Sequence, residues 1–273
     1  MKSFHLHLVS DATGETVSSV ARACLVQFED IAPIQHQWWL VRSEVQIERV
    51  LKAIEDEPGL VLYTVIDAEV RARLDAGCRR LNVPCIGVLH PVISALAKHL
   101  DAEMASPSPG RQHAMDADYF ARIDAMHFTL AHDDGQMVHD LDSADIIVLG
   151  VSRTSKTPTC MYLANRGIKA ANVPLVPGVP VPPEVMAAKN PLIVGLTREP
   201  SSLSDIRRNR LRLLDQSEDG SYADVEKVRE EILGARRLFA ANGWPVIDVT
   251  RRSIEEAAAN ILQLYAKKTG KVL

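Results

Sequence analysis

Short apolar runs alternate in the first part of the chain with segments in which apolar side chains recur at helical spacing. The runs expected to form strands are FHLHLV (4–9), QWWLV (37–41), LVLYTVI (60–66) and PCIGVL (84–89). The helical spacing after the first run is carried by Val17, Val20, Cys24, Leu25 and Phe28. Alternation of this kind is typical of a parallel sheet with helices packed on it.

The second part of the chain continues this pattern. Strands are expected at DIIVLG (145–150), PLIVGLT (191–197) and PVIDVT (245–250). Helices are expected near 203–214, over the segment from Val225 to Phe239, and from Ser253 onward, where Ser253 and Glu256 have the spacing of a capping box. The proline-rich segment 173–184 is expected to be a loop. The pattern predicts an α/β fold throughout.

Residues 101–118 interrupt the alternation. The stretch SPSPG (106–110) has the composition of a linker, and we expect a domain boundary there. An N-terminal α/β domain with a parallel sheet and a regulatory or partner-binding role would then span residues 1–105. A second domain would span residues 106–273. A chain of 273 residues has room for two domains.

Composition and charge limit the classes of function. The chain has 31 basic and 35 acidic residues, a net charge of −4, which argues against a general nucleic-acid-binding protein. No apolar run reaches the roughly 18–20 residues of a membrane span, and the first residues do not resemble a signal peptide. Cys24, Cys78, Cys85 and Cys160 are scattered, as expected for reduced thiols. We expect a cytoplasmic protein without membrane or nucleic-acid partners; the oligomeric state is open, a homodimer included.

The segment GVSRTSKTP (150–158) comes close to the phosphate-binding P-loop pattern G-x-x-x-x-G-K-[ST]. Gly150, Lys156 and Thr157 are in register, while Ser155 replaces the second glycine. A predicted strand precedes the segment and a predicted helix follows it, so free backbone N–H groups would face an anion. Lys156 would supply positive charge, and the Thr157 hydroxyl would hold Mg²⁺. The second domain is therefore expected to be a P-loop-containing, kinase-like α/β domain.

Ser155 leaves a second interpretation open. A serine at this position must adopt a backbone conformation that favours glycine, or the loop must follow a different path. The alternative is a capped helix start that carries a surface lysine. Just beyond the loop, Cys160 is interpreted as a small apolar filler rather than as a reactive thiol.

Transfer of a phosphoryl group to a hydroxyl needs a group that accepts the hydroxyl proton. Asp133 and Asp134, in AHDDG upstream of the loop, are the best candidates, and on an extended segment only one of them would face the site. Their alternative role is a polar turn closed by Gly135. Arg153, inside the loop, has the guanidinium fork that suits a phosphate clamp.

Two further segments have less specific patterns. Arg207, Arg208 and Arg210 crowd one predicted helix, either as a solvated face or as a contact to phosphate or to a protein target. The junction LVSDATGET (8–16) is interpreted as a helix start capped by its own side chains, with an anion site or a partner contact as the alternative.

The histidines show no metal-binding spacing. His5 and His7 alternate on one face of the first predicted strand without a third ligand nearby in sequence, so no structural zinc is expected. His113 lies in the linker segment, where an exposed histidine is the ordinary interpretation.

Together these motifs resemble the bifunctional kinase–pyrophosphorylase regulatory family. Besides the loop at 150–158, the matching stretches are SDATGET (10–16), GRQH (110–113), HDDG (132–135), ANVPLVP (171–177), LSDIRRNRL (203–211) and SIEE (253–256). Members of this family use ADP to phosphorylate a threonine beside the phosphocarrier histidine of pyruvate, phosphate dikinase or of phosphoenolpyruvate synthase. They remove that phosphate with inorganic phosphate and release pyrophosphate.

The resemblance implies the same chemistry here, with ADP and inorganic phosphate as cosubstrates and with Mg²⁺. It implies an ADP site made of Gly150, Val151, Ser152, Arg153, Thr154, Ser155, Lys156 and Thr157. Serine before the lysine resembles the dikinase-type members, so the dikinase is the expected target and the synthase the alternative. A small-molecule P-loop kinase or NTPase and a non-catalytic nucleotide sensor are the competing hypotheses.

Overall fold

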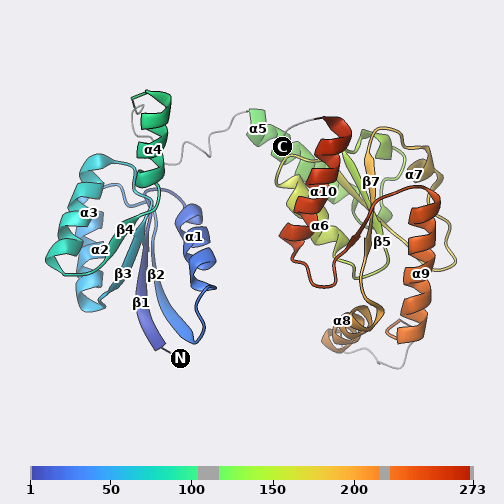
Figure 1. The fold of residues 1–273 in the computed structure, drawn as a ribbon, viewed down its shortest axis with the longest axis horizontal. Coiled ribbons are helices and arrows are strands. Elements are labelled where there is room, and N and C mark those ends of the chain that lie inside the picture. Colours follow the sequence, from blue (N-terminus) through green and yellow to red (C-terminus); the bar gives the residue numbers. More distant parts are fainter. Residues whose placement is uncertain (1, 104–116, 215–221, 271–273) are drawn as a thin grey trace. The chain divides into compact units, whose positions relative to one another are not determined.

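The structure is a computed structural model that describes residues 2–103, 117–214 and 222–270. The chain divides into two compact units, Met1–Ala114 and Met115–Leu273 (Figure 1). The linker 106–110 and the boundary expected at 105/106 lie outside the described residues, and so does His113.

The first unit is a parallel sheet of four strands in the order β2-β1-β3-β4. The strands are β1 (Lys2–Val9), β2 (Ile31–Trp38), β3 (Gly59–Tyr63) and β4 (Cys85–Gly87), and the helices are α1 (Glu15–Leu25), α2 (Glu44–Asp56), α3 (Ala68–Arg80) and α4 (His90–Leu100). Helix α1 covers one face, where Leu6 and Leu8 are buried, and α2 and α3 cover the other (Figure 1). The predicted parallel α/β architecture is confirmed.

One strand prediction in this unit is wrong. The second strand was expected at 37–41, but β2 spans Ile31–Trp38. This strand lies at the edge of the sheet, where a proline such as Pro33 is tolerated and few side chains are buried. Trp39 and Val41 are apolar because the loop after the strand is packed: Trp39 lies against Gly14, and Val41 belongs to the core under α2.

The second unit is also a parallel four-stranded sheet, in the order β6-β5-β7-β8. Its strands are β5 (Ile146–Gly150), β6 (Ala170–Pro174), β7 (Leu192–Thr197) and β8 (Val246–Asp248). Its helices are α5 (Ala117–Ala131), α6 (Lys156–Ala164), α7 (Pro183–Ala187), α8 (Pro200–Leu213), α9 (Val225–Ala241) and α10 (Ile254–Thr269), and two 3₁₀ turns span Asp133–Gly135 and Leu141–Ser143.

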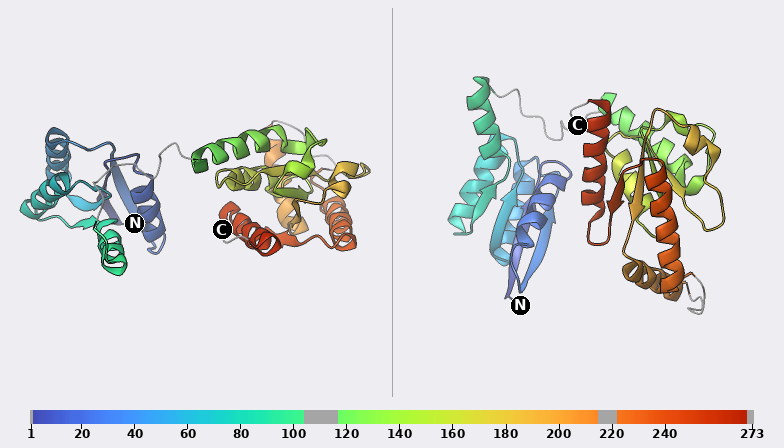
Figure 2. Two further views of the ribbon diagram at one scale, coloured as in Figure 1. Left: turned by 90° about the horizontal axis from the view of Figure 1, so that it is seen from above. Right: turned by 45° about the vertical axis from the view of Figure 1, so that its right-hand side comes forward.

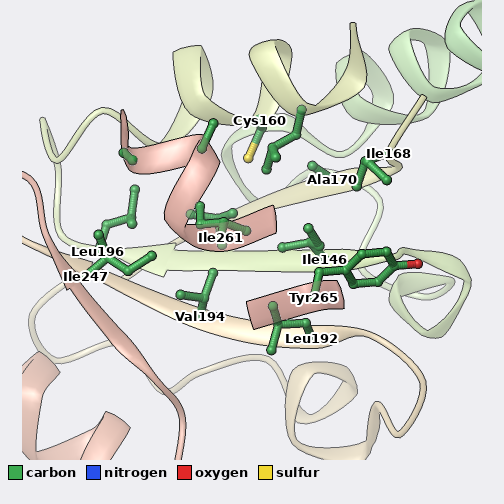
Figure 3. Packing of buried hydrophobic residues seen from close by; sticks show 14 of the residues in the cluster. Ile146, Cys160, Ile168, Ala170, Leu192, Val194, Leu196, Ile247, Ile261 and Tyr265 are labelled. Carbon is green, nitrogen blue, oxygen red and sulfur yellow. The ribbon is translucent and has the colours of Figure 1, made fainter. Parts of the chain in front are cut away.

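Helices cover both faces of this second sheet (Figures 1 and 2). On one face, Ile146 and Val194 of the strands pack against Ile261 and Tyr265 of α10 (Figure 3). On the other face, α8 and α9 pack against the sheet, with Phe239 fully buried. The capping box expected at Ser253 is present and starts α10, since the Ser253 and Glu256 side chains each accept the other's backbone N–H.

The expected loop 173–184 overlaps a strand, because β6 continues to Pro174. The sequence of β6, AANVP, has little strand propensity, and burial beside β5 makes it a strand. Helix α5 was also not expected. In the part of the chain that the structure describes, no helix combines the length and the apolarity needed to cross a membrane.

Candidate functional site

Residues 150–157 connect the carboxyl end of β5 to the start of α6. Ligands of open parallel α/β sheets bind at this edge. Gly150 is required here because the loop folds back closely: a Cβ atom would lie 2.6 Å from the Thr154 hydroxyl oxygen and 2.8 Å from the Leu196 carbonyl oxygen. The loop is therefore held against both central strands.

The loop has an unusual backbone. Arg153 and Ser155 both have left-handed conformations, with φ of 70° and 64°. Of the two alternatives left open for Ser155, the structure shows the less favourable dihedral. Alternation of left-handed and right-handed residues turns successive N–H groups toward one point, as in anion-binding nests. Helix α6 starts at the next residue, and Ser155 forms no side-chain cap there, which leaves its first N–H groups available.

Lys156 is the first residue of α6, and its side chain turns back under the loop. Its side chain is buried, and its Nζ donates a hydrogen bond of 3.0 Å to the Val151 carbonyl. Burial lowers the pKa of Lys156 to about 8, against the opposing influence of the Asp134 and Asp133 carboxylates. The alternative of a capped helix start with a surface lysine is wrong on both points.

Asp133 and Asp134 have different environments. They lie in a 3₁₀ turn in which Asp134 is left-handed, not on the extended segment that was expected. The Asp133 Oδ1 atom accepts hydrogen bonds from the Thr157 hydroxyl at 2.9 Å and from the Asn172 amide at 2.6 Å. Asp134 instead lines a cleft of about 330 Å³ in front of the loop. The other lining residues are Ser152, Arg153, Ser155, Lys156, Thr157, Pro158, Pro174 and Ile206.

Arg207 supports the loop from behind. The guanidinium is 1 % exposed, forms an ion pair of 2.7 Å with Glu231, and donates to the Ser152 carbonyl at 3.2 Å. It also lies over the ring of Tyr222, whose hydroxyl bonds to that of Ser152. For Arg207 the expected solvated face is wrong, whereas Arg210 is exposed and Arg208 forms a half-exposed pair with Asp205.

Arg198 and Asn172 also belong to the site, and the sequence reasoning missed both. Arg198 directly follows β7, and one of its Nη atoms lies 3.5 Å from the Ser155 hydroxyl. Burial lowers its pKa. Buried Arg198 Nε, Asn172 Oδ1 and Thr159 Oγ1 have no hydrogen-bond partner among the described residues. Unpaired buried polar atoms are costly, and a bound ligand would be a partner for Arg198 Nε and Asn172 Oδ1, whose side chains contact Ser155 and Thr157. A polar residue just past a strand end was the available signal for Arg198.

Two other expected features are not part of this arrangement. Cys160 is fully buried, and burial raises the pKa of its thiol, which confirms the interpretation as a filler. The junction 8–16 lies in the first unit, at the carboxyl end of β1. Its helix is capped by Gly14 in a left-handed conformation without a side-chain hydrogen bond, so capping by its own side chains is wrong.

An α/β unit with a backbone nest, a buried lysine and a threonine–aspartate pair at a strand-to-helix junction has the features of proteins that bind phosphates. The sequence profile of the Kinase/pyrophosphorylase family matches residues 6–262, and the chain belongs to this family.

Relatives with provisionally assigned names match nearly the whole chain. A pyruvate, phosphate dikinase regulatory protein of Paramagnetospirillum magneticum is 64% identical over 98% of this chain and 86% of its own length. The protein of the same name from Rhodospirillum rubrum is 57% identical over 96% of this chain and 95% of its own. The protein of the same name from Caulobacter vibrioides is 54% identical over 98% of this chain and 85% of its own length.

Proposed function

We propose that this protein is an ADP-dependent serine/threonine kinase that also removes the phosphate with inorganic phosphate, and that its target is pyruvate, phosphate dikinase. The observation that carries the proposal is the left-handed, N–H-rich loop of residues 150–157 above the buried Lys156. One anion position then serves both directions, because the β-phosphate of ADP and free orthophosphate present the same oxygens to the loop.

In the kinase direction, the threonine Oγ attacks the β-phosphorus of ADP, the bond to the bridging oxygen breaks, and AMP leaves. In the other direction, an oxygen of orthophosphate attacks the phosphothreonine phosphorus, the bond to Oγ breaks, and pyrophosphate leaves. Lys156 and Arg153 would neutralise the transferred group, and the support for this is that both line the cleft. Arg198, with its unpaired Nε, is a third candidate.

Asp134 and Asp133 have different roles in this proposal. Asp134 lines the cleft, so we assign it as the base that takes the threonine proton and returns it in the reverse reaction. Asp133 already accepts the Thr157 hydroxyl hydrogen, so it orients Thr157. The Thr157 hydroxyl and the Asp133 carboxylate supply hard oxygen atoms of the kind that Mg²⁺ prefers, and the unpaired Asn172 Oδ1 is a third such atom. Mg²⁺ held there would neutralise phosphate charge.

The choice of target rests on the relatives, whose names specify pyruvate, phosphate dikinase. A protein substrate also suits the surroundings of the loop. A cavity of about 790 Å³ borders Val151 and Tyr222. It is lined by apolar side chains of 175–181 and by α9, which contributes Ala235 and Leu238 as well as the charged Lys227, Glu230 and Glu231. Val176 and Val179 on its rim are half-exposed or more. An open apolar surface of this kind fits a protein better than a small metabolite.

The proposal is tested with the purified chain, ADP labelled in its β-phosphate, and either the dikinase or phosphoenolpyruvate synthase. We expect label on a threonine of the dikinase, release of AMP, and recovery of the label as pyrophosphate when orthophosphate is added. Label on the synthase alone would replace the target. ADP turnover without a protein substrate would support a small-molecule kinase, and binding without transfer would support a sensor.

A further inference from the structure

Two histidines and a carboxylate meet in the first unit, far from the loop in sequence. Strands β1 and β2 pair in parallel with His7 opposite His36, so His5 lies two residues away on the same face. Glu57 directly follows α2, at the same end of the sheet. One ligand atom from each of His5, His36 and Glu57 lies within 4.8 Å of the others.

The two imidazoles are close to ligand spacing, while the carboxylate faces the other ring nitrogen of His36. His5 Nδ1 and His36 Nε2 are 2.9 Å apart, and Glu57 Oε2 lies 3.5 Å from His36 Nδ1. Two nitrogens bound tetrahedrally to Zn²⁺ lie roughly 3.3 Å apart, given zinc–nitrogen bonds of about 2.0–2.1 Å. Movements of a few tenths of an ångström would therefore convert the hydrogen-bonded histidine pair into a pair of ligands. The half-exposed Glu57 side chain has to turn further to join them, starting from a position within 4.8 Å.

His7 is not a ligand but holds the others in place. Its Nε2 donates to the Glu57 carbonyl at 2.9 Å, and its Nδ1 accepts from the Trp38 indole at 3.4 Å, so both ring nitrogens are used. This bond fixes the backbone of Glu57. The His7 ring also stacks on that of His36, with centroids 4.5 Å apart and planes 16° from parallel. The orientation of His36 is thus set before any ion arrives.

The local electrostatics favour a cation. The site lies at the carboxyl end of α2, where the helix dipole is negative. The Glu57 carboxylate adds a full charge, and its side chain is half-exposed, which gives an ion access from solvent. Imidazole nitrogens with one carboxylate are typical ligands of zinc and related transition metals.

We propose that His5, His36 and Glu57 bind a divalent transition-metal ion, best Zn²⁺, with water in the remaining position. This proposal departs from the expectation of no structural zinc, which rested on sequence spacing, because the ligands come from β1, β2 and the end of α2. The ion ties the edge strand β2 and the end of α2 to β1, so its binding stabilises the first unit. This inference does not depend on the proposed kinase activity.

The test is titration of the tag-free, chelator-treated full chain with Zn²⁺ in a calorimeter, supported by Co²⁺ absorption. We expect one equivalent of Zn²⁺ bound with a Kd of about 1 µM or tighter, and a higher Tm of the first unit. H36A and E57Q should each weaken binding by at least about 30-fold and remove the rise in Tm. E57Q keeps the backbone carbonyl that His7 needs.

H99A is the matched control, since His99 is an exposed histidine of the same unit on α4. It should bind Zn²⁺ like the unaltered chain. Binding of Zn²⁺ by the unaltered chain that is weaker than this expected Kd, or unchanged affinity in both H36A and E57Q, would overturn the proposal. Circular dichroism of the metal-free chain identifies a variant that fails to fold. If H36A or E57Q fails in this way, the Zn²⁺ affinity of the remaining variant tests the proposal.

Discussion

The two units have the same sheet topology but different chemistry at the same place. In each, the first strand lies inside a parallel sheet, flanked by the second and third strands of that unit, and a loop leads from it into the next helix. In the first unit this loop is 10–14, with a buried Asp11 whose carboxylate accepts the Ile66 N–H at 2.7 Å. In the second unit the corresponding loop is 151–155, and Lys156 follows it at the start of α6.

The difference teaches that topology supplies an edge for binding and side chains decide what binds there. The carboxylate of Asp11 lies where the first unit could otherwise present N–H groups to an anion, and the cavity there is only about 10 Å³. Lys156 and its cleft of about 330 Å³ favour an anion instead. Four experiments test this contrast.

The largest effect is expected at Lys156. Because both directions need the same anion position, K156A should lower phosphorylation and phosphate-dependent dephosphorylation by about 10³-fold each. Two control variants should bind ADP within about twofold of the unaltered chain. D11N alters the corresponding loop of the first unit, and K189A removes an exposed lysine of the second unit. The measurements are labelled transfer and ADP titration. Loss of only one direction in K156A would mean two separate centres.

Arg207 tests whether the second loop depends on its buried support. R207A leaves Glu231 and the Ser152 carbonyl unpaired, so we expect the second unit to lose about 3–5 kcal/mol of stability. Hydrogen exchange measures this loss in α9 and compares it with the helices of the first unit, which should not change. The control is R210A, at an exposed position of the same helix. Equal protection of α9 in both variants would contradict a supporting role.

Asp134 and Asp133 provide a contrast within the site. D134N removes the proposed base and should lower kcat by about 10²-fold with little effect on ADP affinity. D133N should instead raise the Mg²⁺ concentration needed for half-maximal rate, because it alters the residue bonded to Thr157. Initial rates at varied ADP and Mg²⁺ separate the two. If D133N behaved like D134N, the assignment of roles would be wrong.

The smallest effect is a dependence on pH. The pKa of Lys156 is about 8 without ligand, and a bound anion raises it. Below pH 8 the lysine is already charged and adds no further pH dependence to the affinity. Above pH 8, binding requires proton uptake, so orthophosphate affinity should fall by up to about tenfold per pH unit. Calorimetry in buffers of different ionisation enthalpy measures the uptake, and K156A should lack it.

Periodicity predicted most of the strands correctly where they are buried on both faces. Residues of β5 and β7 form continuous apolar runs, and the sequence placed both within one residue of their bounds. It failed at the edge strand β2, whose Gln35 and Gln37 face outward, and at β6, whose Ala-Ala-Asn has weak propensity. In these cases neighbouring strands, not local preference, determine the conformation.

In the candidate site, the sequence alone was enough to predict that four residues lie together, because a loop between a buried strand and a helix is a local feature. These residues are Gly150, Ser155, Lys156 and Thr157. The folded structure was needed to separate Asp133 from Asp134, to bury Arg207, and to bring in Arg198 and Asn172 from neighbouring strands. The His5, His36 and Glu57 group has the same origin. Contacts between distant segments depend on sheet order and register, which one sequence does not encode as a readable spacing.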